Sequence, residues 1–293
     1  MPSPMSDEPR VLSPENLPDS IRILNESSRG MSFEWHLDLF GFLALARYWN
    51  ISEQHTLLGY EDGQPAALII TATDPETREA YIVYWAALPQ FRKGRTAIRL
   101  FESCCQKLYD DGYEILYGAS VPDRPVRRYR FIKSDVEYAI LDLQAASTDL
   151  PESQSRFEVR EIDLETISTV ALPHGEPVHW CQRNAFLRNG SMFFQILGAF
   201  EGETLRAYAI SVRKATPTMT IDFRSPDSSL EAGYELLRWL FSHDYRPPLF
   251  ASDVFENSYA HRMLSSAGFT VKRRFDTLIR DLRTTCKDRT ISL

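Results

Sequence analysis

The same order of predicted secondary structure occurs twice along this chain of 293 residues, and the repetition limits the fold more than any single motif does. Each half contains two apolar runs around a Gly turn, then a third apolar run, an amphipathic helix and a further strand. The runs of the first half are 55–60, 65–72, 80–88, 97–108 and 114–120, and those of the second half are 192–200, 205–212, 219–223, 230–241 and 249–253. The repetition predicts two domains of α/β architecture.

The limits of these domains follow from composition. Residues 145–156 have no apolar period and are rich in Ser, Thr and acidic residues, which predicts a linker. The first domain then covers 21–144 and the second covers 157–293. Residues 1–20 are rich in Pro, Ser and acidic residues, so we expect a flexible N-terminal segment. A strand over 136–143 is expected to close the sheet of the first domain.

A cationic turn joins the third apolar run of the first half to its helix. The run 80–88 is followed by Pro89-Gln90-Phe91-Arg92-Lys93-Gly94-Arg95-Thr96 and by apolar residues at helical spacing from Ala97 to Leu108. The N-terminus of a helix presents unpaired N–H groups and a partial positive charge, to which these side chains add. The turn therefore predicts a site for a phosphate or pyrophosphate. It matches neither G-x-x-x-x-G-K-[ST] nor G-x-G-x-x-G.

Composition excludes several other classes of protein. A net charge of −7 argues against a nucleic-acid-binding chain, because such chains usually present a basic face. No apolar run is long enough to span a bilayer and the N-terminus has no signal-peptide pattern, so we expect no membrane association and a cytoplasmic location. The four cysteines form no C-x-x-C pair. We expect reduced thiols and no metal, and we interpret His174 and His179 near Cys181 as surface or packing residues.

The cationic turn resembles the acyl-CoA pyrophosphate loop of the GCN5-related N-acetyltransferase (GNAT) superfamily, V-x-P-x-x-[RQ]-x-x-G-x-[GA]. In this alignment Arg92 takes the Arg/Gln position and Ala97 the final small position, while Arg95 stands where the family usually has its first Gly, unless Gly94 takes that role. The resemblance implies that the loop binds acetyl-CoA or another acyl-CoA as co-substrate. The implied cofactor-binding residues are Ala87, Leu88, Arg92, Lys93, Gly94, Arg95, Thr96 and Ala97.

The second half resembles the same superfamily in a different motif. Residues 257–269, NSYAHRMLSSAGF, follow the pattern N-x-x-A-x-x-x-[LY]-x-x-x-G-F, in which the Asn caps a helix and the Gly ends it. Leu264 stands where a catalytic Tyr would be. The turn 224–229 has no pyrophosphate-loop pattern, and its Asp227 would repel a phosphate. The resemblance therefore implies a second GNAT-like domain without a cofactor loop.

Together these resemblances imply two tandem GNAT domains, each with a mixed, mostly antiparallel sheet, a splayed central strand pair and flanking helices. The implied function is an acyl-CoA-dependent N-acyltransferase, which would most simply transfer acetyl from acetyl-CoA to a primary amine of a small molecule or peptide. Tyr129 is the implied general acid toward the departing thiolate, and an amide near Ala87 or Leu88 would hold the oxyanion. Glu79 is a weaker candidate for the general base.

Two other functions stay open at the level of sequence. A tandem GNAT fold also occurs in aminoacyl transferases that use charged tRNA, although these need a basic surface and this chain has only short basic clusters. The other alternative is a non-catalytic GNAT-like module whose cleft binds a peptide or metabolite, because the loop departs from the family pattern.

Overall fold

The computed structural model describes residues 7–29, 36–92, 94–120, 132–133, 140–145, 150–153, 156–169, 179–212, 219–243 and 249–286, and every statement below concerns these residues. The chain forms two compact units. Unit 1 comprises Met1–Ser120, Arg124–Ser134 and Leu278–Leu293, and unit 2 comprises Val121–Asp123 and Asp135–Thr277.

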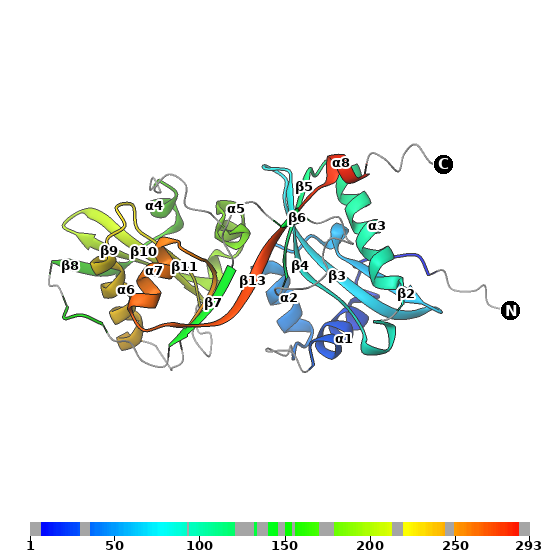
Figure 1. Ribbon diagram of the computed structural model, residues 1–293, viewed down its shortest axis with the longest axis horizontal. Helices are drawn as coiled ribbons and strands as arrows, with labels where there is room; N and C mark the ends of the chain where they lie inside the picture. The colour runs from blue at the N-terminus through cyan, green and yellow to red at the C-terminus, as the bar shows by residue number, and fades with distance from the viewer. Residues whose placement is uncertain are drawn as a thin grey trace. The chain divides into compact units, whose positions relative to one another are not determined.

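Unit 1 contains a mixed, mostly antiparallel sheet in the order β1-β2-β3-β4-β5-β13, with β6 paired to β13. β4 and β5 are paired in parallel, whereas the pairs β1–β2, β2–β3, β3–β4 and β13–β6 are antiparallel (Figure 1). The elements are β1 (Arg10–Val11), α1 (Leu17–Ser28), α2 (Leu39–Tyr48), η1 (Glu53–His55), β2 (Leu57–Glu61), β3 (Gln64–Asp74), β4 (Glu79–Ala87), η2 (Pro89–Phe91), α3 (Thr96–Asp110), β5 (Ile115–Ser120), β6 (Ile132–Lys133), the end of β13 (Thr270–Asp281) and α8 (Leu282–Cys286).

Helices cover both faces of the unit 1 sheet. On one face α1 and α2 bury Ile23, Leu24 and Phe42 against apolar residues of β2 and β3. On the other face α3 buries five residues at helical spacing, namely Leu100, Phe101, Cys104, Cys105 and Leu108. The two cysteines pack as small apolar side chains, and burial raises the pKa of Cys104 to about 11, so its thiol stays protonated. The predicted amphipathic helix after the cationic turn is therefore confirmed.

Unit 2 repeats this architecture. Its sheet has the order β8-β9-β10-β11-β12-β7-β13, in which only β11 and β12 are paired in parallel. The helix α6 packs against this sheet and buries Leu236, Leu237 and Leu240. The elements are β7 (Ile140–Ala145), β8 (Phe157–Glu161), α4 (Leu164–Ser168), η4 (Trp180–Gln182), α5 (Asn184–Asn189), η5 (Ser191–Phe193), β9 (Phe194–Glu201), β10 (Thr204–Val212), β11 (Met219–Arg224), α6 (Leu230–His243), β12 (Leu249–Phe255), α7 (Tyr259–Ser266) and the start of β13.

Both predicted hairpins are present. The β2–β3 turn holds Asp62 at φ 51° and Gly63 at φ 74°, and the β9–β10 turn holds Gly202 at φ 59°. Backbone of this left-handed kind suits the tight turns that join antiparallel strands, and Gly adopts it without strain. The Gly turns in the sequence therefore located both hairpins correctly.

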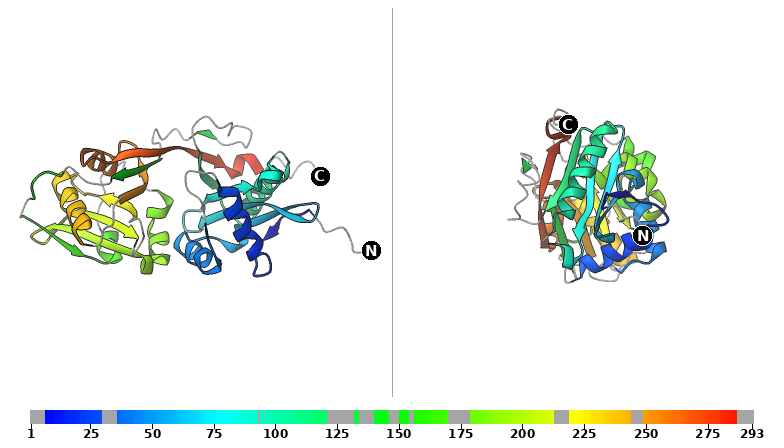
Figure 2. Two further views of the ribbon diagram at one scale, coloured as in Figure 1. Left: turned by 90° about the horizontal axis from the view of Figure 1, so that it is seen from below. Right: turned by 90° about the vertical axis from the view of Figure 1, so that its right-hand side faces the viewer.

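The strand predicted over 136–143 does not close the first domain. β7 lies in unit 2, where it pairs with β12 and β13 and buries Leu141 and Leu143. Figure 2 shows β13 as one long strand between α7 and α8. Its first half pairs with β7, and its last residues pair with β6 in unit 1. The alternating apolar patterns of β7 and β13 suit either sheet, so the local sequence does not specify the partner.

The observed units thus differ from the predicted segments 21–144, 145–156 and 157–293. Unit 1 takes its last elements from the C-terminal end of the described chain, where Leu278, Leu282 and Cys286 are buried in the cluster that contains α3. The buried Arg280 guanidinium forms an ion pair with Glu102 of α3 at 3.1 Å. At the other end, Arg10–Val11 and the first turn of α1 lie inside the segment that we expected to be flexible.

Among the described residues, none of the helices combines the length and the apolar character that crossing a bilayer requires.

The C-terminal segment should stabilise unit 1. We expect Leu282→Ala, at a fully buried position, to lower the free energy of unfolding by about 2–5 kcal/mol because it leaves a cavity. Hydrogen exchange followed by mass spectrometry should show faster exchange in α3 and β5. The matched control is Leu264→Ala, an equally buried leucine of unit 2, which should accelerate exchange in α6 and α7 instead. Unchanged exchange in α3 of Leu282→Ala would contradict this assignment.

Candidate functional site

The central strand of unit 1 contains a β-bulge. Thr71 of β3 pairs with Ile82 of β4, but the preceding Ile70 pairs with Tyr84, so Val83 is an extra residue on β4. The packing agrees with this register, because the consecutive residues Val83 and Tyr84 both contact the cluster on the α1 face. Bulges bend a strand and increase its local twist, and they are frequent beside active sites.

Beside this bulge β4 separates from β5. The parallel pairing joins Glu79–Ile115, Ala80–Leu116 and Tyr81–Tyr117 and stops there, although β4 continues to Ala87. The Leu88 N–H donates to the Ala66 carbonyl at 2.9 Å, toward β3. Because backbone groups alternate in direction along a strand, the Ala87 N–H points to the opposite edge. Of the two predicted oxyanion donors, Ala87 therefore faces the opening and Leu88 does not.

The predicted phosphate loop forms a tight turn whose own amides are partly used. The Phe91 N–H donates to the Leu88 carbonyl at 2.9 Å, and the Gly94 N–H donates to the Phe91 carbonyl at 3.0 Å. Among the described residues no acceptor is assigned to the main-chain N–H of Arg95 or Thr96, at the start of α3. These two N–H groups lie at the N-terminus of α3, where unpaired donors and the helix dipole stabilise an anion.

The side chain of Glu61 occupies part of this helix end. The Glu61 carboxylate, at the end of β2, accepts a hydrogen bond from the Thr96 hydroxyl. A Cβ at Gly94 would lie 2.8 Å from the Glu61 Oε2, so Gly is required there for the carboxylate to come this close. The sequence analysis missed Glu61, although an equivalent Glu201 ends β9 before the corresponding turn of unit 2. That repeated glutamate was the available signal.

Three exposed arginines surround the same helix end, and they differ in what they contact. Arg92 Nη2 donates to the Ser27 carbonyl at the end of α1 at 3.3 Å, and Arg99 Nη2 donates to Thr96 Oγ1 at 3.3 Å. For Arg95, the structure assigns no ion pair with a described residue. The Ala97 carbonyl accepts the Trp85 indole N–H at 3.2 Å. Lys93 and Tyr129, which the sequence also nominated, lie outside the described residues.

Tyr84 is a further candidate that the sequence analysis missed. Its hydroxyl lies 2.8 Å from Ser27 Oγ, and it directly follows the extra residue of the bulge. Burial raises the pKa of Tyr84, and this exceeds the opposing effects of Ser27 and of the Arg92 charge, so the phenol is protonated at neutral pH. The sequence gives no signal for Tyr84, because it lies within an apolar strand pattern and only the structure shows its contact with Ser27 of α1.

Glu79, the weaker candidate for a general base, lies at the opposite end of β4. Its carboxylate accepts a hydrogen bond from the Tyr117 hydroxyl at 3.0 Å where β4 and β5 are still paired. Eight residues separate it from Ala87, which corresponds to about 26 Å along an extended strand. Glu79 is therefore far from the loop at the start of α3.

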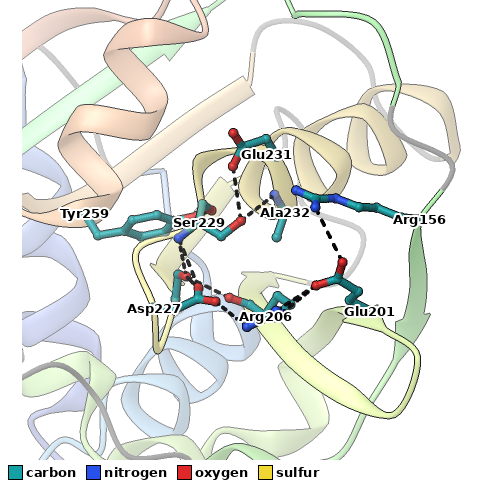
Figure 3. Close-up of polar contacts among 9 residues, drawn as sticks. Arg156, Glu201, Arg206, Asp227, Ser229, Glu231, Ala232 and Tyr259 are labelled. Carbon is teal, nitrogen blue, oxygen red and sulfur yellow. Dashed lines mark hydrogen bonds and ion pairs between the residues drawn. The ribbon is translucent and has the colours of Figure 1, made fainter.

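The corresponding helix end of unit 2 is closed by a network of charges (Figure 3). The Asp227 carboxylate accepts the Ser229 N–H at 3.1 Å and forms an ion pair with Arg206 at 2.7 Å. Arg206 also pairs with Glu201 at 2.7 Å. The Tyr259 hydroxyl donates to the Ser229 carbonyl at 2.8 Å. The N-terminus of α6 is thus occupied by a carboxylate of the chain itself, that of Asp227, which is paired with Arg206.

The strand opening of unit 2 is likewise filled. β11 has a bulge at Ile221, and its pairing with β12 covers only two residue pairs, Met219–Phe250 and Thr220–Ala251. In the opening, the buried Arg224 guanidinium pairs with Asp222 at 2.9 Å and donates to Gln182 Oε1 at 2.7 Å. The remaining pocket has room for about one water molecule.

Comparison with solved structures identifies the fold. A tandem GNAT protein from the clavulanic acid biosynthesis pathway matches with a TM-score of 0.68 and 12% identity, covering 94% of this chain and 99% of that one. A GCN5-related N-acetyltransferase from Sphaerobacter thermophilus matches with a TM-score of 0.67 and 13% identity, covering 94% and 95%. One from Anabaena variabilis matches with a TM-score of 0.59 and 12% identity, covering 94% and 72%.

Neither the family models nor the curated proteins give a match to the sequence. The structural likeness covers both units, and the order of their strands, each with one splayed parallel pair, agrees with it. The chain therefore has the tandem fold of the GCN5-related N-acetyltransferase superfamily.

Proposed function

We propose that this chain is an acyl-CoA-dependent N-acyltransferase whose acyl-CoA site lies in unit 1. The observation that carries this proposal is the open edge of β4 after the Val83 bulge, which leads to a cationic helix N-terminus. The similar structures named as N-acetyltransferases support the same reaction class. Acetyl transfer from acetyl-CoA to a primary amine of a small molecule or peptide is the simplest form of this reaction.

The residues around the opening suit the two chemical parts of an acyl-CoA. Arg95 and Arg99, together with the Thr96 N–H, offer positive charge and a hydrogen-bond donor to a pyrophosphate. The exposed edge of β4 offers backbone groups to the amide-containing arm, as an added strand would use them. A bound acyl-CoA supplies a thioester that an amine can attack.

In the proposed reaction the lone pair of the amine attacks the thioester carbonyl carbon, the carbon–sulfur bond breaks, and the amine loses a proton to solvent water. The Ala87 N–H would stabilise negative charge on the carbonyl oxygen. A tyrosine would protonate the departing thiolate. Tyr129 is the candidate from the family pattern, and Tyr84 is the candidate because it follows the bulge of β4 and keeps a protonated phenol.

In this proposal unit 2 binds no acyl-CoA. Asp227 at the start of α6 would repel a pyrophosphate, and its pairing with Arg206 removes the positive charge that could attract one. The buried Arg224–Asp222 pair stands in the strand opening where the arm of the co-substrate would lie. Unit 2 then serves as a scaffold or contributes to acceptor binding.

One observation favours a second candidate, a non-catalytic ligand-binding module. The Glu61 carboxylate lies at the helix end that would bind the pyrophosphate, and like charges there disfavour each other. The Glu61 carboxylate accepts a hydrogen bond from Thr96 and lies close to Gly94, so it is an anion that the helix N-terminus already stabilises. The two candidates are separated by calorimetric titration of the full chain with acetyl-CoA and by an acetylation assay over a panel of primary amines.

Arg95 should bind the co-substrate directly. We expect Arg95→Ala to weaken acetyl-CoA binding by about 10-fold to 100-fold, since one charge-assisted hydrogen bond contributes about 1.5–3 kcal/mol. Isothermal titration calorimetry measures this change. Arg78→Ala, an exposed arginine paired with Glu114 at the turn before β4, is the matched control and should bind normally. Equal affinities of Arg95→Ala and the parent chain would remove the loop assignment.

Glu61 should act on stability and on affinity in opposite directions. We expect Glu61→Gln to lower the free energy of unfolding by about 0.3–1 kcal/mol, because a negative charge leaves the α3 N-terminus. The same change should tighten binding of acetyl-CoA, because it removes repulsion from the pyrophosphate. Thermal denaturation and calorimetry test the two effects separately. A weaker affinity in Glu61→Gln would refute the proposed position of the pyrophosphate.

The two tyrosines should be distinguishable by kinetics. If a tyrosine protonates the thiolate, its replacement by Phe should lower kcat about 100-fold and leave the KM for acetyl-CoA nearly unchanged. Tyr84→Phe and Tyr129→Phe are to be compared under identical conditions. Tyr109→Phe, near the C-terminal end of α3, is the control. Full activity of both variants would exclude tyrosine as the acid.

A further inference from the structure

A buried group of three potential metal ligands lies in unit 2, apart from both helix ends. The His179 Nδ1 is 3.0 Å from the Cys181 Sγ, and the Cys181 Sγ is 3.7 Å from Asp253 Oδ2. The His179 Nε2 is 3.8 Å from Asp253 Oδ1. One donor atom from each residue lies within 4.8 Å of the others. The His and Cys side chains are buried, while the Asp side chain is 36% exposed and so gives access from solvent.

The fold holds these residues together through two separate devices. The turn of η4 is closed by the Gln182 N–H donating to the His179 carbonyl at 2.9 Å, and Gln182 Nε2 donates to the Ile221 carbonyl of β11 at 2.8 Å. Asp253 stands at a register shift of β12, with φ 58°. Left-handed backbone is costly for a residue other than Gly and is concentrated at functional sites. The bulge therefore directs Asp253 toward η4.

Metal binding requires Cys181 as a thiolate. The binding of a cation would therefore release the thiol proton of Cys181 to solvent.

The donor types indicate the class of ion, because His nitrogen, Cys sulfur and Asp oxygen are all zinc ligands. Tetrahedral zinc has bonds of about 2.0–2.3 Å to N, O and S, which places its ligand atoms about 3.3–3.8 Å apart. With one donor atom taken from each residue, the three atoms lie within 4.8 Å of one another, so the longest separation would have to shorten by up to about 1 Å when the ion binds. We propose that His179, Cys181 and Asp253 bind a zinc ion, whose fourth position is taken by water or an external ligand.

His179 is buried, in agreement with the interpretation from sequence that it packs, and the proposal adds a ligand role to it. Its spacing is H-x-C in one short turn, with the third ligand 72 residues later. Spacing rules detect ligands that are paired within one helix or one loop, so they miss a site completed by a distant strand. In the zinc-bound chain the ion joins η4 to β12 and stabilises unit 2.

X-ray absorption at the zinc edge of the full chain loaded with one equivalent of zinc tests the proposal without a variant. We expect one sulfur at about 2.3 Å and a shell of nitrogen and oxygen at about 2.0–2.2 Å. The cobalt-loaded chain should show a thiolate-to-cobalt charge-transfer band and the intense visible bands of tetrahedral cobalt. A shell of nitrogen and oxygen alone, or no bound zinc after gel filtration, would overturn the proposal.

Variants then assign the ligand. Cys181→Ser should lose the charge-transfer band and bind zinc more than about tenfold more weakly. Loss of a residue that only hydrogen-bonds to a ligand already weakens metal binding about 10-fold to 100-fold, and loss of the ligand itself should cost more. Cys286→Ser, a buried cysteine of unit 1, is the matched control and should keep the parent affinity. Circular dichroism checks that both variants are folded. Parent-like zinc affinity in a folded Cys181→Ser would also overturn the assignment.

Discussion

One extra residue in the central strand β4 marks the point where this strand separates from β5 and leaves an edge that is unpaired among the described residues. The bulge at Val83 shifts the pairing of β4 with β3 by one residue, and the parallel pairing with β5 ends at Tyr81, just before it. The rest of β4 keeps backbone groups directed at an edge that β5 does not fill. Because the opening arises from backbone pairing, it does not depend on particular side chains, and unit 2 repeats it at Ile221 of β11.

Charge at two equivalent helix ends distinguishes the units. Both α3 and α6 begin after the bulged strand, and both have a carboxylate at their N-terminus, from Glu61 and Asp227 respectively. In unit 2 the carboxylate has its own arginine partner at 2.7 Å, and a second, buried ion pair fills the strand opening. In unit 1 the Glu61 carboxylate instead accepts a hydrogen bond from the Thr96 hydroxyl. Among the described residues, the same fold therefore leaves the helix N-terminus of unit 1 without a paired carboxylate–arginine network, whereas that of unit 2 has one.

A third bulge shows how irregular pairing positions polar groups. At Asp253 the register of β12 against β7 shifts, and the carboxylate reaches the turn that carries His179 and Cys181. Asp142 of β7 lies opposite this register shift and pairs with Arg273 of β13 at 3.6 Å.

The sequence by itself determined the repeated order of elements, the Gly hairpins and the amphipathic helix α3, because periodicity and turn residues act over short distances. It also located the cationic turn before α3 and, in the corresponding turn before α6, the acidic residue Asp227. Only the tertiary structure decided that β7 belongs to unit 2 and the end of β13 to unit 1, because either strand pattern fits either sheet. The contacts of Glu61, Tyr84 and the His179 cluster also come from the tertiary structure alone. Each depends on strand register and on contacts between residues far apart in the chain, which no local pattern encodes.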